Sequence, residues 1–276
     1  MSSRCRSRAV ARVLSALLTI AACAEPPSRR AAEPPPLRAC ADPNNLPFTN
    51  AAGEGFENRI AELLADELGR PLEYTWWPQR RGFVRQTLRA GRCDLLLGVP
   101  ADFELAWTTR PYYRSGYVFV TRAGAPPIES FDDPALRSLR VGVQLVGDDY
   151  ANTPPAHALA ERGMAAQLVG YSVYGDYSKP NPPARIVEAV ARGDVDVAVV
   201  WGPLAGYFAS RQPTPLRLTP VRPAMDFGYL PFTFAISLAV RRGDTALHAA
   251  VEAAMERRRG DVERILDEYG VPRVSE

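Results

Sequence analysis

The stretch from Leu37 to Gly69 constrains the fold more than any other part of the sequence. It opens with the apolar run LRACA, which ends at an Asp-Pro turn and predicts a strand. Residues 42–55 have the proline, asparagine and glycine content of a loop. Apolar residues then recur at helical spacing from Phe56 to Leu68. A long loop thus joins the carboxyl end of a strand to a helix, and ligands usually bind at that edge of an open α/β sheet.

The first 23 residues have the pattern of an export signal. Four arginines precede an apolar run from Val13 to Ala22, which is shorter than the roughly 20 residues of a membrane span. The run ends in Ile-Ala-Ala-Cys, which resembles a bacterial lipobox, so we expect Cys23 to carry a lipid. Simple cleavage near Ala24 is the alternative. Residues 24–36 are rich in proline and predict an extended spacer.

Export would place the remaining cysteines in an oxidising compartment. Cys5 leaves with the signal, while Cys40 lies in the first predicted strand and Cys93 opens the third. These two strands are neighbours in a parallel sheet of order 2-1-3. We therefore predict a disulfide between Cys40 and Cys93, and two buried thiols are the alternative.

Alternating strand and helix patterns predict two α/β lobes. In the first lobe they predict strands at 72–77, 93–99 and 115–121 and a helix at 79–90. In the second they predict strands at 140–145, 167–169 and 195–201 and helices at 154–162, 183–191 and 203–211.

Two segments are expected to connect the lobes. Residues 122–127 turn polar and are interpreted as a hinge, and residues 214–223 as a second crossing. A final strand at 233–240 and helices at 244–257 and 260–269 would return to the first lobe. The predicted organisation is a signal at 1–23, a spacer at 24–36, a first lobe at 37–121 plus 225–276, and a second lobe at 122–224.

Charge and motif content argue against several function classes. Removing the four arginines of the signal leaves 29 basic residues against 31 acidic ones, which does not suit a nucleic-acid binder. His157 and His248 are far apart and near no cysteine cluster, so a zinc-finger type of metal site is not expected. The sequence has no GxSxG, Walker A or HExxH motif. Binding is favoured over catalysis.

Several segments carry a family resemblance. GFENRIAELLA, PYYRSGYVFV and RGDVDVAVVWGP resemble periplasmic solute-binding proteins of family 3. ADPNNLPF, LEYTWWPQRRGFVRQTL and VWGPLAGYFA more closely resemble the MxaJ/XoxJ group, solute-binding-like proteins associated with quinoprotein alcohol dehydrogenases and methanol oxidation. The resemblance runs from Leu37 to Pro272. It implies a two-lobed α/β fold of the type II periplasmic binding protein class, with a double-crossing hinge and a ligand cleft between the lobes.

The resemblance also shows where this sequence departs from ordinary amino-acid receptors. Those receptors hold the ligand carboxylate with an arginine shortly before the PYY segment, where Asp102 stands here. They hold the ammonium with an aspartate directly after a second-lobe strand, where Trp201 stands here. We therefore expect no amino-acid ligand.

Nine residues are candidates for the cleft: Asn44, Asn45, Phe48, Glu57, Trp77, Arg81, Arg110, Tyr112 and Trp201. Each has a simpler structural interpretation. Asparagines cap turns, a glutamate is favoured at a helix N-terminus, aromatic rings pack in cores, and arginines cover solvated helix faces.

Residues 171–183 form a long polar and aromatic loop. Loops of this length are often functional, and its Tyr171, Tyr174 and Tyr177 are candidates for contact with a partner. A surface flap is the alternative.

The resemblance implies a periplasmic, non-catalytic accessory protein, tethered by a lipid on Cys23. It would assist the maturation, assembly or activation of a PQQ-dependent methanol or alcohol dehydrogenase, with that enzyme or its cytochrome c as partner. PQQ and calcium or lanthanide would belong to the partner, so no cofactor or metal of its own is expected, and no nucleic acid. The alternative is the receptor of an ABC importer for a small non-amino-acid solute, and an enzyme resembling a dehydratase is a third, disfavoured hypothesis.

Overall fold

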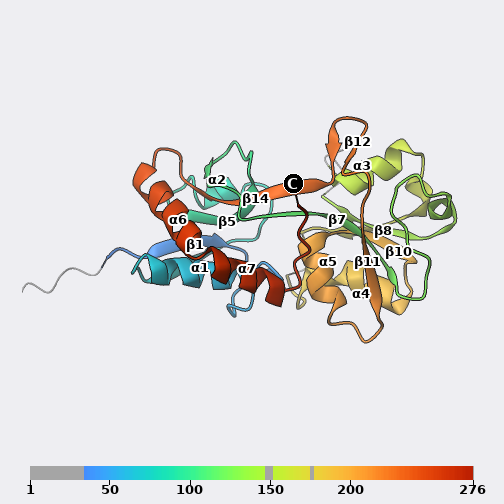
Figure 1. Ribbon diagram of the computed structural model, residues 1–276, viewed down its shortest axis with the longest axis horizontal. Helices are drawn as coiled ribbons and strands as arrows, with labels where there is room; N and C mark the ends of the chain where they lie inside the picture. Colours follow the sequence, from blue (N-terminus) through green and yellow to red (C-terminus); the bar gives the residue numbers. More distant parts are fainter. Residues whose placement is uncertain (1–33, 147–151, 175–176, 276) are drawn as a thin grey trace, which may run out of the picture. The chain divides into compact units, whose positions relative to one another are not determined.

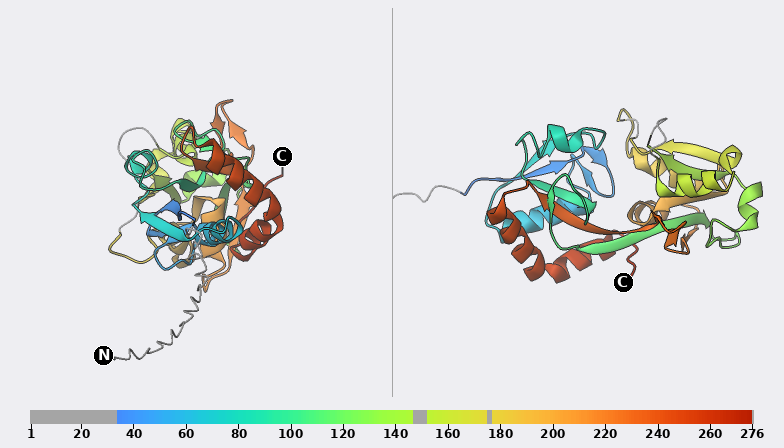
Figure 2. Two further views of the ribbon diagram at one scale, coloured as in Figure 1. Left: turned by 90° about the vertical axis from the view of Figure 1, so that its left-hand side faces the viewer. Right: turned by 90° about the horizontal axis from the view of Figure 1, so that it is seen from above.

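The computed structural model describes residues 34–146, 152–174 and 177–275. Two α/β lobes are connected by two long strands, β7 (Tyr113–Arg122) and β14 (Thr233–Val240), which are seen side by side in Figures 1 and 2. The predicted signal with Cys23 lies outside the described residues. Within the described ranges, no helix combines the length and the apolar character that a membrane crossing needs.

The first lobe contains the predicted sheet. β1 (Leu37–Ala41) lies between β4 (Leu72–Trp76) and β5 (Leu95–Pro100), and all three are parallel. β14 extends this sheet antiparallel to β5. Leu95 and Leu97 of β5 face one apolar core and Leu96 faces another, so β5 is covered on both faces as its continuous apolar run predicts.

The disulfide between Cys40 and Cys93 is confirmed. It joins β1 to the residue two positions before β5, with 5.4 Å between the Cα atoms. Because β1 and β5 are hydrogen-bonded neighbours, the bridge adds a covalent link beside an existing parallel ladder.

Helix α1 (Phe56–Glu67) begins where the predicted loop ends. The Asn58 side chain accepts hydrogen bonds from the backbone N–H groups of Gly55 and Asn50, each at 3.0 Å, and so fixes the loop to the first turn. A Cβ atom at Gly55 would lie 1.9 Å from the carbonyl oxygen of Phe48. Glycine is therefore required here because the loop backbone passes so close to the helix start.

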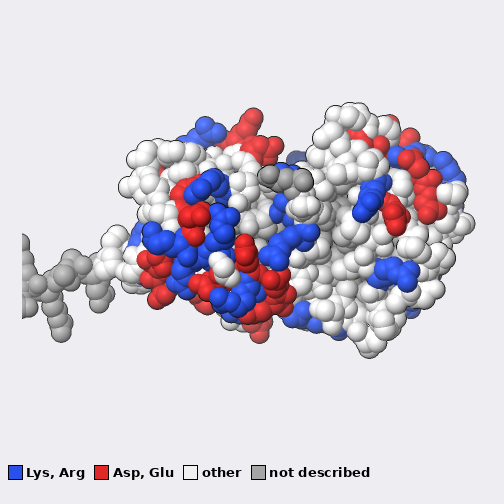
Figure 3. Space-filling view, viewed as in Figure 1, with Lys and Arg blue, Asp and Glu red and all other residues white. Residues whose placement is uncertain are grey.

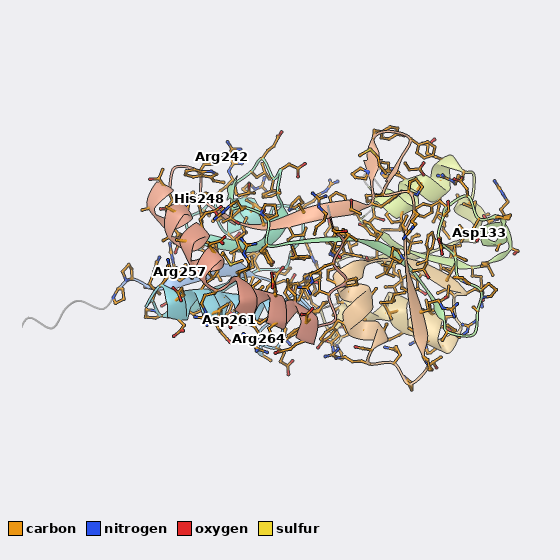
Figure 4. All side chains as sticks on the ribbon, in the orientation of Figure 1. Asp133, Arg242, His248, Arg257, Asp261 and Arg264 are labelled. Carbon is orange, nitrogen blue, oxygen red and sulfur yellow. A yellow bond between two sulfur atoms is a disulfide. The ribbon has the colours of Figure 1, made fainter. Side chains whose placement is uncertain are left out.

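Helices α6 (Thr245–Arg257) and α7 (Arg259–Glu268) return to the first lobe and pack on α1. Arg257 pairs with Glu67 of α1 at 2.5 Å, and Arg264 pairs with Asp261 at 2.7 Å. Figure 4 shows these arginines and Asp261 along the outer side of the two helices. The contacts of α6 and α7 with α1 are thus contacts with the first lobe, where the sequence prediction also places these helices.

The helix predicted at 79–90 is mostly turn. Only α2 (Phe83–Gln86) is helical, because Gly82 before it has a left-handed φ of 88° and Thr87 after it leaves the helical region. The predicted inward residues still face the core, since Leu88 is buried and Phe83 and Val84 pack beside it.

The second lobe is a sheet covered on both faces. β10 (Val197–Trp201), β8 (Val141–Leu145) and β9 (Leu168–Ser172) are mutually parallel neighbours. Helices α4 (Arg185–Arg192) and α5 (Gly202–Ala209) pack on one face, and α3 (Pro154–Glu161) on the other.

The short elements complete the chain. They are β2 (Asn44–Asn45), β3 (Thr49–Asn50), β6 (Trp107–Thr108), β11 (Leu216–Pro220), β12 (Met225–Asp226), β13 (Leu230–Pro231), and the 3-10 helices at Pro134–Ser138, Ala165–Gln167 and Pro182–Ala184.

The lobes are joined within strands, which corrects two predictions. β7 pairs with β14 over Tyr113–Gly116 and then with β10 from Tyr117 onward, so the passage between lobes lies inside β7. The predicted hinge at 122–127 lies in the second lobe, where Arg217 binds the carbonyl oxygens of Ala123 and Ala125. β11, expected at the second crossing, pairs with β7 in the second lobe, and β14 makes that crossing instead. The strand pattern alone does not show where a strand changes its partner.

Candidate functional site

A cleft of about 290 Å³ lies between the lobes at the carboxyl ends of β1 and β10. Its first-lobe wall consists of Asp42, Asn44, Asn45, Phe48 and Gln79. Its second-lobe wall consists of Gln144, Thr153, Val173, Tyr174, Tyr177, Pro182, Pro183, Trp201 and Leu204, with Tyr117 of β7 between the two.

Asp42 is the one charged residue among the described residues that line this cleft. It is 3% exposed, and its carboxylate accepts hydrogen bonds from the backbone N–H of Asn44 at 2.8 Å and of Gln79 at 2.6 Å. The hydroxyl of Tyr177, from the second lobe, donates a third bond to it. Burial and this carboxylate together raise the pKa of Tyr177 above its usual value, so the hydroxyl stays a donor. The carboxylate is therefore satisfied by the chain itself.

Further contacts join the lobes directly across the cleft. The Asn44 amide donates to the carbonyl oxygen of Lys179 at 2.9 Å and accepts from the Asn181 backbone N–H at 3.3 Å. Leu46, in the turn between β2 and β3, is buried in the second-lobe core. A first-lobe loop and a second-lobe loop thus close on each other through polar and apolar contacts.

Trp201 forms the apolar wall at the end of β10. Its ring packs edge-on against Tyr117 at 5.4 Å and Phe234 at 5.9 Å, the aromatic residues of the two connecting strands. An aromatic surface does not replace the carboxylate that an ammonium group needs. Asp102 is exposed in the turn after β5 and does not line the cleft. The described lining residues therefore provide no arginine for a carboxylate and no second-lobe acid for an ammonium.

Glu57 lies in a neighbouring pocket of about 200 Å³ in the first lobe. This pocket is lined by apolar residues such as Phe83, Val99 and Phe103, and it shares Asp42 with the cleft. Glu57 is 8% exposed, and no described residue donates a hydrogen bond to its carboxyl group. Burial without such donors raises its pKa to about 8, so the group is mainly protonated at neutral pH. A Cβ atom at Gly98 would lie 2.1 Å from Oε1, so glycine makes the space for this carboxyl group.

The predicted site residues separate into two groups. Asn44, Asn45, Phe48 and Trp201 line the cleft, as do Tyr174 and Tyr177 of the loop at 171–183. The two tyrosines that were candidates for partner contact thus face the inside of this protein. Tyr171 belongs to β9 and packs beside the second-lobe core.

The other predicted cleft residues lie elsewhere, which corrects those placements. Arg110 pairs with Glu252 of α6 at 2.8 Å, away from the cleft. Tyr112 donates its hydroxyl to the carbonyl oxygen of Leu97 at 3.1 Å inside the first lobe. Trp77 is half-buried, with the guanidinium of Arg92 5.7 Å from its ring centroid. Arg81 is exposed in the turn before α2.

Sequence reasoning missed Asp42, Gln79, Gln144 and Thr153 as cleft residues. Asp42 carried a usable signal, because it directly follows the first predicted strand at the edge where ligands bind. Gln79 follows Trp77 and Pro78 at the end of the next strand in the same way. Asp42 was instead interpreted as part of an Asp-Pro turn, and Gln79 as the first residue of a helix at 79–90.

No group of three or more His, Cys, Asp or Glu residues in the described ranges is arranged to hold a metal ion. Hydrogen-bond donors, amides and aromatic rings dominate the cleft, so its chemistry is that of binding.

Comparison with known proteins agrees with this architecture. The family described as bacterial extracellular solute-binding proteins, family 3, matches residues 37–272, and the chain belongs to this family. Within it the chain is of the MxaJ/XoxJ type. It is 34% identical to Protein MoxJ of Methylorubrum extorquens strain AM1, over 86% of this chain and 81% of that protein.

Two solved structures of this type have the same fold. The crystal structure of MxaJ from Methlophaga aminisulfidivorans MPT matches with a TM-score of 0.73 and 26% identity, over 86% of this chain and all of that chain. The crystal structure of the periplasmic binding protein XoxJ from Methylobacterium extorquens AM1 matches with a TM-score of 0.71 and 34% identity, over 87% of this chain and all of that chain.

Proposed function

We propose that this chain is a non-catalytic periplasmic accessory protein for a PQQ-dependent methanol or alcohol dehydrogenase. It assists the maturation, assembly or activation of that enzyme, and its partner is the dehydrogenase or the associated cytochrome c. PQQ and the metal are bound by the partner. A lipid on Cys23 holds the accessory protein at a membrane surface.

The state of Asp42 is the observation that carries this proposal. A receptor presents its charged groups to a solute, whereas here the one charged group in the described cleft lining is bound by Tyr177, Asn44 and Gln79 of the same chain. Likeness to MoxJ, MxaJ and XoxJ supports the assignment to the dehydrogenase system.

Deletion of the gene tests the proposal. The expected result is a dehydrogenase that is present in the periplasm but largely inactive, with lowered PQQ or metal content, and a return of activity when the wild-type gene is restored. Complementation with a gene that carries Asp102→Asn is the control. It should restore activity as the wild-type gene does, because Asp102 is exposed and lies outside the cleft. Full dehydrogenase activity in the deletion strain would contradict the proposal.

A second candidate is the receptor of an ABC importer for a small non-amino-acid solute. The retained cleft of about 290 Å³ and the adjoining Glu57 pocket favour it. Native mass spectrometry of the protein purified from periplasm would then show a bound solute, and affinity purification would recover importer membrane subunits without the dehydrogenase.

A further inference from the structure

The hairpin formed by β12 and β13 carries an exposed apolar tip. Met225, Phe227 and Tyr229 are 51%, 48% and 68% exposed, and they are three of the six large apolar residues exposed in the described part of the chain. Figure 3 shows mostly uncharged surface in the region of this hairpin on the second lobe. Exposed apolar residues that cluster in this way typically mark an interaction site.

The base of the hairpin holds this tip in place. Arg162, itself mostly buried, pairs with Asp226 at 2.7 Å and with Asp132 at 2.8 Å, and its guanidinium lies 5.0 Å from the ring centroid of Phe227. The Phe227 and Tyr229 rings stack with 6.1 Å between their centroids. The side chains of the tip are therefore held in one arrangement although they are exposed to solvent.

Phe227 also has a φ of 49°, in the left-handed region that a bulky side chain rarely adopts. Such a conformation is strained for a residue other than glycine and tends to occur at functional sites. An asparagine would meet this backbone with less strain, yet the sequence places an aromatic ring here. The aromatic ring of Phe227 thus stands at a position whose backbone conformation disfavours a bulky side chain.

A basic groove of about 660 Å³ adjoins the hairpin. Arg222 and Ala224, the residues before Met225, line it together with Arg114 of β7 and Arg273 of the C-terminal segment. No acidic residue is among its described lining. Arg273 pairs with Asp267 at 2.5 Å, whereas no described residue forms an ion pair or side-chain hydrogen bond with Arg114 or Arg222. Figure 3 shows basic side chains at this seam between the lobes, beside the C-terminal segment.

We propose that the hairpin tip and this groove form one docking surface for an acidic protein partner. The partner places carboxylate side chains beside Arg114 and Arg222 and receives Phe227 and Tyr229 in an apolar pocket. Charge complementarity selects an acidic partner, because the guanidinium groups of Arg114 and Arg222 have no acidic partner among the described residues. Rigid aromatic residues are the typical anchors of such interfaces. This inference rests on the proposed function only because the dehydrogenase is chosen as the first protein to be tested for binding.

The test measures binding of the exported protein to the purified holo-dehydrogenase of the same organism at several salt concentrations. One variant combines Phe227→Asn and Tyr229→Ser, and a second combines Arg114→Glu and Arg222→Glu. Each is expected to weaken binding by roughly tenfold or more, and the charge reversal should also reduce the dependence of affinity on salt. Tyr229→Ser alone serves as the fallback should the double tip variant fail to fold.

Two controls carry the same changes at exposed positions outside this surface. Arg137→Glu reverses a charge near Asp133, which Figure 4 labels at the outer end of the second lobe, and Leu105→Ser removes an exposed apolar residue of the first lobe. Both should bind as the wild type does. Unchanged binding by the docking-surface variants, with the wild type bound, would overturn the inference and leave the proposed function intact.

A wild-type protein that does not bind the dehydrogenase would instead remove the proposed function. The docking surface is then tested with the acidic model peptide acetyl-Leu-Glu-Glu-Leu-Glu-Glu-amide. Binding of this peptide to the wild type and to the arginine variant is measured by NMR at low salt. Binding that the arginine variant loses supports the docking surface. Absence of binding, or equal binding to both proteins, overturns it.

Discussion

Asp42 and Glu57 are two buried carboxyl groups that line the same first-lobe pocket and have opposite surroundings. Asp42 receives hydrogen bonds from two backbone N–H groups and the Tyr177 hydroxyl. Glu57 receives none from the described residues, and burial raises its pKa to about 8. The comparison shows that a buried acid that lacks hydrogen-bond donors is favoured in its neutral form. Asp42 connects the lobes, whereas Glu57 is a neutral group that faces a cavity.

Glu57→Gln should produce the largest effect. The native state holds a proton on Glu57 that the unfolded chain releases from about pH 4.3 upward, so the wild type loses stability as the pH rises to about 8. The loss approaches about 5 kcal/mol at most, since each pKa unit corresponds to about 1.4 kcal/mol. Urea unfolding across this pH range should show the variant equal to the wild type at pH 4 and more stable at pH 8.5. Glu62→Gln, at an exposed position of the same helix, is the control and should leave the pH profile unchanged.

Asp42→Asn should act in the opposite direction. The amide places an NH₂ group where a carboxylate oxygen now accepts from Gln79 and Tyr177, so at least one charged hydrogen bond is lost and donors face each other. A decrease of about 3 kcal/mol in the free energy of unfolding is expected, since bonds to charged groups contribute about 1.5–3 kcal/mol each. Urea unfolding at pH 7 measures it, with Asp102→Asn as the exposed control. A decrease no larger than that of the control would show that the Asp42 contacts do not stabilise the fold.

Tyr177→Phe isolates the contact between the lobes. It removes one hydroxyl donor and keeps the ring, which lies 4.8 Å from the guanidinium carbon of Arg80. The expected loss in the free energy of unfolding is about 2 kcal/mol, together with faster amide exchange at Gln79 and Asn44. Tyr174→Phe is the matched control from the same loop. Equal exchange in both variants would show that the hydroxyl does not hold the lobes together.

The last prediction is that amino acids do not bind in the cleft. Isothermal titration calorimetry with the standard amino acids should give no binding heat, because the described cleft lining has no arginine for the carboxylate and has Trp201 in place of the acid for the ammonium. Micromolar binding of any amino acid would contradict this interpretation of the cleft and would favour the receptor hypothesis.

Much of the fold was predictable from local pattern. The strand at Leu37–Ala41 and the helix that begins at Phe56 have strong periodicity and clear turn residues, and both were located closely. The disulfide followed from strand order and compartment. Gly82 turned most of a predicted helix into turns, because a backbone conformation that depends on one glycine leaves the apolar spacing unchanged.

The candidate site was less predictable, because it depends on contacts between distant segments. Arg110 was expected near the cleft, but Glu252, 142 residues later in the chain, holds it against α6. Asp42 and Tyr177 are 135 residues apart, and nothing local to either indicates their contact. The hairpin at Met225–Pro231 was also missed, since its apolar residues face outward and give no amphipathic pattern.

The continuity of β7 has a practical consequence for dissecting the protein. The second lobe uses one half of this strand as an inner member of its sheet, flanked by β10 and β11, while the other half pairs with β14. A cut between Gly116 and Tyr117 would place β5 and Tyr113–Gly116 in one fragment and β14 in the other, so β5 and β14 would both lose a partner. Open edges of this kind are templates for aggregation. The two fragments of such a cut are therefore not independent folding units, and a gene that encodes either fragment alone should yield insoluble protein.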